Sequence, residues 1–184
     1  LMHEMREIEK EKAYLTENGI YVIFDGESAE SGTFLIEGPP DSFYKYGWYL
    51  FSFSYPPDFP LLPPKVTFLS NDVSGKTIRY HPNLYTNGYV CVNILNTFGA
   101  HMWSPSLNLV TIIQSIKTGI IGLEHPLEGE PSYTLPAGGK PNESHFKFES
   151  LVRYKTLEYS ALIQVIDALT KDTSQMVPYR EIVL

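Results

Sequence analysis

The chain has 184 residues, of which 43% are hydrophobic and 19% are charged. This length and apolar content suffice for one domain with a full hydrophobic core. The net charge of -7, with a pI near 5.2, argues against a nucleic-acid partner, because phosphate binding depends on clustered lysine and arginine.

The first element that the sequence predicts is a surface helix from residue 2 to about residue 15. Met2, Met5 and Ile8 recur at three-residue spacing among charged side chains, so they would form the apolar stripe of this helix. The Asn18-Gly19 pair that follows is typical of the end of a helix.

The clearest strand begins after Gly47. Large aromatic side chains alternate there with smaller ones, as a half-buried strand requires. Its aromatic face would be formed by Tyr49, Phe51, Phe53 and Tyr55. Residues 33–36 and 65–69 predict neighbouring strands, and the proline-rich turns between the three segments indicate an antiparallel meander.

Helical periodicity begins after Ser104-Pro105-Ser106. Apolar side chains recur there at three- and four-residue steps, which predicts a helix with one buried face. That face would contain Leu109, Ile112, Ile113, Ile116 and Ile120. Strands first and helices after indicate an α+β fold.

A segment rich in glycine and proline, residues 126–141, predicts a loop before the last helix. This helix would run from about residue 143 to residue 169. Its inward side chains are predicted to be Leu151, Leu162, Val165, Ile166 and Leu169.

The cysteine and histidine content limits the chemistry of the chain. Cys91 is the only cysteine, which excludes an internal disulfide and a thiolate-rich zinc site and favours the cytoplasm or the nucleus. The five histidines show no metal-ligand spacing. No stretch has the apolar character of a membrane span or a secretion signal. We expect no metal, no cofactor and no membrane association.

Cys91 stands eight residues after Asn83 of the tripeptide His81-Pro82-Asn83. Its apolar neighbours Val90 and Val92 favour an inert core thiol, since cysteine is among the most buried residue types. The alternative is a nucleophile beside a carboxamide that a proline-stiffened turn holds as a donor to an oxyanion. Local composition alone favours the inert thiol.

Further motifs surround the cysteine in a fixed order. They are Gly38-Pro39-Pro40-Asp41-Ser42, the proline-rich segment from Tyr55 to Val66, His81-Pro82-Asn83 with Gly88 and Cys91, and Trp103-Ser104-Pro105. With these motifs the chain resembles the catalytic domain of ubiquitin-conjugating (E2) enzymes. The Z-type subgroup is the most similar, because Trp103 follows Cys91 at a longer spacing than in most of the family and long segments precede the tripeptide and follow Pro126.

The resemblance implies the UBC fold, with an N-terminal helix, an antiparallel four-stranded meander, a catalytic loop and C-terminal helices. Residues 1–170 would form the catalytic core and residues 171–184 a C-terminal extension. The implied partners are an E1 activating enzyme, ubiquitin or a ubiquitin-like protein, RING or HECT E3 ligases and substrate proteins. The chain itself is expected to be a monomer.

The resemblance also assigns roles to residues. Cys91 would carry the modifier as a thioester, in a shallow groove open to solvent, and Asn83 would stabilise the oxyanion when an amine attacks. An equal alternative is that the Asn83 amide holds the loop by bonding to the backbone. His81 would be structural. On the opposite lip Glu128 is the best candidate to assist the incoming lysine, with Glu124 and His125 behind it; a solvated acidic loop is the alternative.

Contacts with E1 and E3 enzymes would involve the first helix and two loops. The candidates are Arg6, Leu61, Ser104, Pro105 and Ser106. Trp103 would support the active-site loop, its indole N–H bonded to a loop carbonyl. The inserted segment 97–102 could gate the sulfur or simply pack. Two competing functions remain: a catalytically silent ubiquitin-binding protein, and a cysteine hydrolase that pairs Cys91 with His101 or His125.

Overall fold

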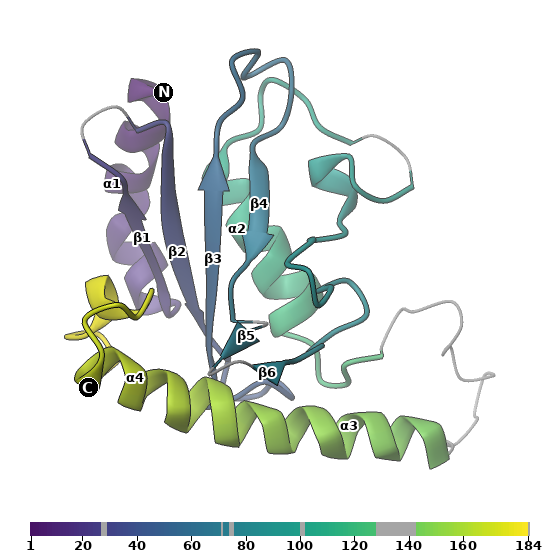
Figure 1. Ribbon diagram of the computed structural model, residues 1–184. Helices are drawn as coiled ribbons and strands as arrows, with labels where there is room; N and C mark the ends of the chain where they lie inside the picture. Colours follow the sequence, from purple (N-terminus) through teal and green to yellow (C-terminus); the bar gives the residue numbers. More distant parts are fainter. Residues whose placement is uncertain (27–28, 71, 74–75, 100–101, 128–142, 184) are drawn as a thin grey trace.

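A four-stranded antiparallel sheet forms the centre of the computed structural model, which describes residues 1–26, 29–70, 72–73, 76–99, 102–127 and 143–183. The strands follow one another in space in chain order, so the sheet is the predicted meander (Figure 1). They are β1 (Ile20–Phe24), β2 (Ser31–Glu37), β3 (Trp48–Ser54) and β4 (Lys65–Phe68).

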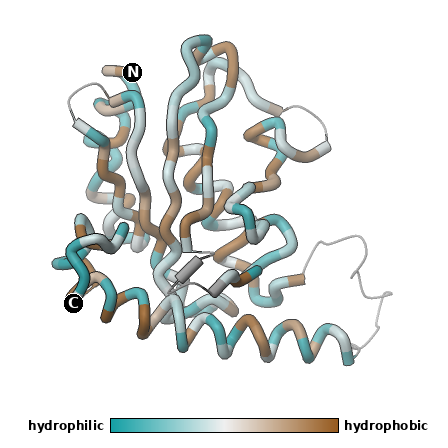
Figure 2. The backbone as a smooth tube through the Cα atoms, in the orientation of Figure 1, coloured by the Kyte–Doolittle hydropathy of each residue, from teal (hydrophilic) through white to brown (hydrophobic). Residues whose placement is uncertain are grey.

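The aromatic face of β3 lies in the main core, as its alternating pattern predicts. Tyr49, Phe51 and Phe53 are all buried, and Phe51 pairs across the ladder with Phe34, the two rings stacking with their centroids 4.9 Å apart. Such pairs contribute roughly 0.5–1.5 kcal/mol beyond the area that they bury. Figure 2 shows apolar residues concentrated along the central strands and the helix packed on them.

That helix is α2 (Leu109–Ile116), which continues as one π-helical turn, η2 (Lys117–Ile121). It starts at Asn108, whose side-chain oxygen accepts the Thr111 N–H at 3.0 Å and so caps the first turn. All five apolar side chains predicted to face inward are buried. The prediction for this helix is confirmed.

The N-terminal helix α1 (Met2–Glu17) exists as predicted, but its buried face is different. Met2 is 60% exposed, whereas Glu4 is buried together with Ile8 and Leu15. The Glu4 carboxylate accepts the Leu109 N–H at 2.9 Å and the Tyr55 hydroxyl at 3.2 Å. A carboxylate is stable here because it satisfies a donor at the start of α2, where the helix dipole also favours negative charge.

The last helix is continuous but irregular, with α3 (Glu143–Lys155), a π-helical stretch η3 (Thr156–Ile163) and α4 (Gln164–Thr170). It runs across one end of the sheet (Figure 1). The predicted inward face is wrong, because four of its five members are exposed: Leu151, Leu162, Ile166 and Leu169. The fifth, Val165, is only partly buried.

For Leu162, Ile166 and Leu169 the π-helical stretch explains this difference, because it shifts the helical phase and turns another face toward the sheet. Leu151 precedes the stretch, and its neighbour Val152 is buried in its place. The buried residues are His145, Val152, Thr156, Tyr159, Ser160, Gln164 and Ala168. Two of them bond to core tyrosines: Thr156 pairs with the Tyr49 hydroxyl at 3.1 Å, and Ser160 donates to the Tyr80 hydroxyl at 3.2 Å. Hydrogen bonds between hydroxyl groups therefore favour burial of the face with Thr156 and Ser160 over the face with the larger apolar side chains.

The C-terminal segment covers the outer face of the sheet. It includes a 3-10 turn, η4 (Val177–Tyr179). A second apolar cluster joins Leu35 and Leu50 of the sheet to Ala168, Met176 and Tyr179. The boundary between a core to residue 170 and an extension from 171 stays a prediction.

The connection between β4 and the candidate site contains a small hairpin of β5 (Asp72–Val73) and β6 (Lys76–Thr77). A short 3-10 helix, η1 (Asn93–Leu95), follows the cysteine. Residues 128–142, which include most of the loop predicted between the last two helices, lie outside the described residues. Of the helices described, none is long and apolar enough to cross a membrane.

Candidate functional site

The loop that carries the cysteine runs beside β4, between β6 and α2 (Figure 1). Its two arms are joined by the Cys91 N–H, which donates to the Asn83 carbonyl at 2.9 Å, and by a bridge between Leu84 and Val90. Gly88, with φ of 86°, makes the turn, and its carbonyl accepts the Phe68 N–H of β4 at 2.8 Å. The sheet thus fixes the loop, and the loop brings Asn83 and Cys91 side by side.

His81 locks the start of this loop. The ring is buried, and its Nδ1 accepts the backbone N–H of Asn83 at 3.0 Å. Burial, with a further effect of the Arg79 charge, lowers the pKa of His81 to about 3. The ring is therefore neutral at physiological pH. Its Nδ1 accepts the Asn83 N–H and so has a structural role.

His81 makes the fold sensitive to acid. Because its pKa is about 3 in the folded chain and near 6.5 when unfolded, the unfolded state takes up the extra proton as the pH falls below about 6.5. We expect this group to remove about 2 kcal/mol of the free energy of unfolding between pH 7 and pH 5. His81→Asn keeps an acceptor but does not titrate, so denaturant unfolding should show a weaker pH dependence for it. Equal pH dependence in both proteins would contradict the prediction.

Cys91 is less open than the sequence suggested. Its side chain is 8% exposed, and the thiol donates to the carbonyl oxygen of Thr97 at 3.4 Å. The expectation of an open groove is therefore wrong: the thiol is buried, and Thr97, the first residue of the inserted segment, lies against the sulfur. Cys91 is nevertheless not a member of the core cluster that contains its neighbours Val90 and Leu95. The thiol lies at the edge of the core, under a thin cover.

Thr97 holds this cover in place. Its hydroxyl accepts the Val92 N–H at 2.8 Å and donates to the carbonyl of Val90 at 2.8 Å or of Val92 at 3.0 Å. Its carbonyl accepts both the Tyr89 hydroxyl at 3.1 Å and the Cys91 thiol. A carbonyl oxygen is an acceptor, so this contact suits the protonated thiol.

Removing the Thr97 hydroxyl should loosen this cover. Thr97→Val keeps the shape of the side chain but loses bonds with a net value of about 1 kcal/mol, so we expect Cys91 to be alkylated by iodoacetamide about five times faster. Thr97→Ser keeps the hydroxyl and is the matched control, expected to react at the native rate. An unchanged rate in the valine variant would show that the hydroxyl does not restrict access.

The Asn83 side chain takes no part in the bonds that hold the loop. The backbone of Asn83 is fully engaged, with the N–H bonded to His81 and the carbonyl to Cys91. Within the described ranges its side chain is half-buried and has no hydrogen-bond partner. Loop anchoring is thus supplied by the backbone and by His81.

The opposite lip is described only in part. Glu128, the predicted assisting acid, lies outside the described residues. Glu124 and His125 are exposed, and the His125 Nδ1 lies 3.0 Å from the Glu149 carboxylate of α3. His125 thus has a carboxylate partner on another element. His101, the other histidine considered for a hydrolase, also lies outside the described residues.

Trp103 links the two loops expected to contact partners. Its indole N–H donates to the Pro60 carbonyl at 2.8 Å, and its backbone N–H donates to Asn96 Oδ1 at 3.0 Å. Leu61 is 73% exposed beside this joint. The tryptophan therefore supports the loop and leaves apolar surface next to it uncovered.

The remaining contact candidates are also at the surface. Ser104, Pro105 and Ser106 are exposed, and Pro105 lines a cavity of about 760 Å³ together with Glu4 of α1 and the loop after β3. Arg6 is exposed but lines a separate groove between α1 and β1. The structure thus joins the loops and the start of α1 in one surface and places Arg6 outside it.

Comparison with known proteins agrees with this geometry. The family model for ubiquitin-conjugating enzyme matches residues 1–152. Ubiquitin-conjugating enzyme E2 Z of Xenopus tropicalis is 36% identical over 115 residues, covering 62% of this chain and 36% of that protein. The human E2 Z is 32% identical over 139 residues, covering 76% of this chain and 37% of that protein. The chain therefore spans well under half the length of these relatives.

A solved structure shares the fold. The E2 domain of a Toxoplasma gondii ubiquitin conjugating enzyme superposes with a TM-score of 0.59 at 24% identity, covering 85% of this chain and 99% of that chain. The predicted α+β UBC fold is confirmed. With the family model matching most of its length and the cysteine loop built as described, the chain belongs to the ubiquitin-conjugating enzyme family.

Proposed function

We propose that this chain is an E2 enzyme that accepts ubiquitin, or a ubiquitin-like modifier, from an E1 enzyme as a thioester on Cys91. It then transfers the modifier to a substrate lysine or to an E3 ligase. The observation that carries the proposal is the backbone bond between Cys91 and Asn83, which joins the residue with the single thiol to the asparagine of the tripeptide.

Loading would be an exchange between two thiols. The Cys91 thiolate attacks the carbonyl carbon of the E1 thioester, a new carbon–sulfur bond forms, and the E1 cysteine leaves as a thiolate. No ATP is consumed in this exchange, because the E1 enzyme has already activated the carboxylate. Thr97 must move off the sulfur before the attack, since its carbonyl occupies the direction in which the thiol now points.

Transfer would then depend on Asn83. The lysine amine attacks the thioester carbonyl, its oxygen becomes negative, and the Asn83 N–H stabilises that charge. The amine gives up its proton and Cys91 leaves as a thiolate. An acid on the opposite lip, with Glu128 the first candidate, would assist proton removal. Asn93 stands two residues after Cys91, where many relatives carry an aspartate, so a charge from that side is missing.

The proposed partners are an E1 enzyme, RING or HECT ligases and substrate proteins. The surface formed by the start of α1, Leu61 and residues 104–106 supports ligase docking, because it is exposed and is joined to the cysteine loop through Trp103. Arg6 lies in the adjacent groove and would serve E1 contact instead. We propose that the protein acts as a monomer in the cytoplasm or the nucleus.

Incubation with E1, ATP and ubiquitin tests the proposal. The products are separated on gels with and without a thiol reductant, and the expected product is one adduct that the reductant removes. Ubiquitin binding without an adduct would indicate a silent binding protein. Cleavage of peptides or esters without ATP would indicate a hydrolase. Parallel reactions with ubiquitin-like modifiers and their own E1 enzymes identify the cargo.

A further inference from the structure

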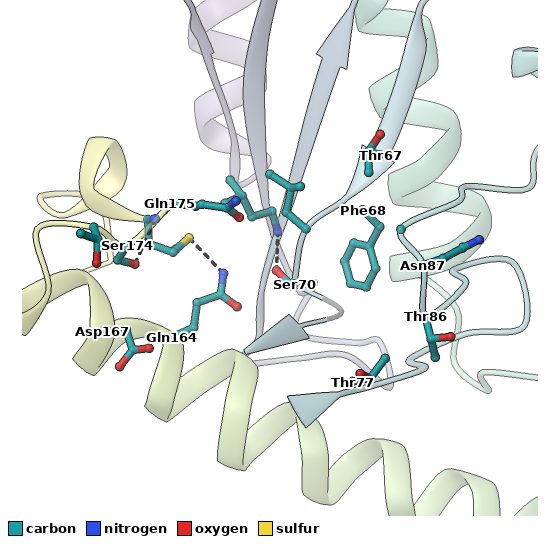
Figure 3. A pocket seen from close by; sticks show the side chains of 15 residues that line it. Thr67, Phe68, Ser70, Thr77, Thr86, Asn87, Gln164, Asp167, Ser174 and Gln175 are labelled. Carbon is teal, nitrogen blue, oxygen red and sulfur yellow. Dashed lines mark hydrogen bonds between the residues drawn. The ribbon is translucent and has the colours of Figure 1, made fainter. Parts of the chain in front are cut away.

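A polar cavity of about 550 Å³ lies between the C-terminal segment and the end of β4 (Figure 3). One wall consists of α4 and residues 173–176, and the other includes Thr77, Thr86 and Asn87. Its volume is in the range of small-ligand sites. Neither the cysteine nor Asn83 lines this cavity, so it is separate from the site described above.

Gln164 is the unusual residue of this cavity. It is the first residue of α4 and is only 5% exposed. Its Nε2 donates to the Met176 sulfur at 2.9 Å, which fixes the orientation of the amide because sulfur accepts and does not donate here. The Oε1 is buried and points to the side of Ser70 and Thr77 (Figure 3), with no hydrogen-bond partner in the described part of the chain.

A buried carbonyl oxygen without a donor is unfavourable, and native proteins seldom contain one. Neighbouring hydroxyls do not fill this need. The Ser70 hydroxyl accepts the Leu50 N–H at 2.8 Å and donates toward Trp48, and the Ser174 hydroxyl accepts the Met176 N–H at 3.2 Å. The donor for Gln164 must therefore come from outside these side chains.

The charge of the cavity favours a cationic donor. Among its described lining residues Asp167 is the only ionisable one, and neither lysine nor arginine lines it. The Asp167 carboxylate is mostly buried and lies 2.7 Å from the Lys171 ammonium, whose side chain is half exposed. A positive group in the cavity would meet oxygen acceptors of the lining, with the Lys171 ammonium, which is paired to Asp167, as a neighbouring cation.

We propose that this cavity binds a guanidinium group, the arginine side chain of a partner protein. A guanidinium carries five donors in one plane and is weakly hydrated, so it can bond to Gln164 and to hydroxyls on the facing wall at a low desolvation cost. Phe68 and Met176 offer apolar contact to its aliphatic stem. An ammonium is more strongly hydrated and has fewer donors for these separated acceptors.

Amide NMR titration of the whole chain tests the proposal with three probes. They are N-acetylarginine amide, its neutral analogue N-acetylcitrulline amide, and the peptide Gly-Ser-Arg-Ser-Gly. We expect saturable shifts at amides lining the cavity with the arginine probe and binding at least about tenfold weaker with citrulline. Tighter binding of the peptide than of the amide would identify a protein side chain as the natural ligand; equal binding would identify a small guanidinium compound and overturn that part of the proposal.

Two variants of Gln164 separate a binding role from a folding role. Gln164→Met keeps the volume but removes the oxygen, so binding should fall about tenfold or more while the melting temperature stays the same or rises. Gln164→Glu adds a charge and should tighten binding of the arginine probe. The matched control is Asp172→Asn, which removes a fully solvated carboxylate outside the cavity and should change nothing.

Three results would overturn the proposal. The first is the absence of saturable shifts with any probe, which would mean that the cavity holds water only. The second is equal affinity for arginine and citrulline. The third is a Gln164→Met variant that binds as the native chain does, or that loses binding together with stability. None of these readouts depends on conjugating activity.

Discussion

Replacing Cys91 with alanine should abolish the ubiquitin adduct. The chain has no second cysteine, so no other side chain can form a thioester. Cys91→Ser should give an adduct that survives reductant, because an oxygen ester is not cleaved by thiol exchange. Gels of the E1 reaction with and without reductant measure both outcomes.

The two variants control for each other. Both change the side chain at a position outside the core cluster, so thermal melting should show that each remains folded. A reductant-sensitive adduct that persists in the alanine variant would exclude Cys91 as the acceptor. Loss of the adduct in a serine variant that remains folded would show that the reaction requires the thiol and does not accept a hydroxyl at position 91.

Asn83→Ala should slow the second half of the reaction. Removing one preorganised oxyanion donor typically costs 100-fold or more in rate, so we expect discharge of the loaded thioester to free lysine to fall roughly 100-fold. Loading should be little changed, because its attacking group is a thiolate, a stronger nucleophile than the lysine amine, and because the loop is held by backbone bonds that the substitution keeps. Single-turnover discharge followed on gels measures the effect.

The control distinguishes this role from loop anchoring. Asn83→Asp keeps the size and an acceptor but removes the amide N–H and adds a negative charge, so discharge should be at least as slow as in the alanine variant. If the carboxamide mainly stabilised the loop, both variants would melt at a lower temperature and would load poorly. Unchanged discharge with normal loading would remove the oxyanion role.

Much of the fold could be predicted from residue patterns. The alternation in β3 and the three- and four-residue steps of α2 correspond to single faces buried against each other, and both predictions are confirmed. The last helix shows where patterns fail. Its buried face is chosen by hydroxyl bonds to Tyr49 and Tyr80, residues distant in the chain, and a π-helical stretch changes its period.

The candidate site also has features that the sequence predicts and features that depend on contacts between distant residues. Cys91 and Asn83 could be singled out because their spacing belongs to a recognised motif, and the loop indeed holds them together. The cover over the sulfur could not be derived, because it depends on where the Thr97 carbonyl points. Glu4 was missed for a similar reason: only the meeting of α1 with α2 makes a buried carboxylate useful, and no local pattern marks it.

The segment that lies against Leu35 and Leu50 also limits how other proteins can approach. An uncovered apolar sheet face can bind other proteins, but here Met176 and Tyr179 already cover that face. A partner that bound the same apolar patch would first have to displace the C-terminal segment, and the apolar contacts of that segment would be lost. On this side of the sheet a partner can therefore reach only the cavity beside Met176, not the strand surface itself.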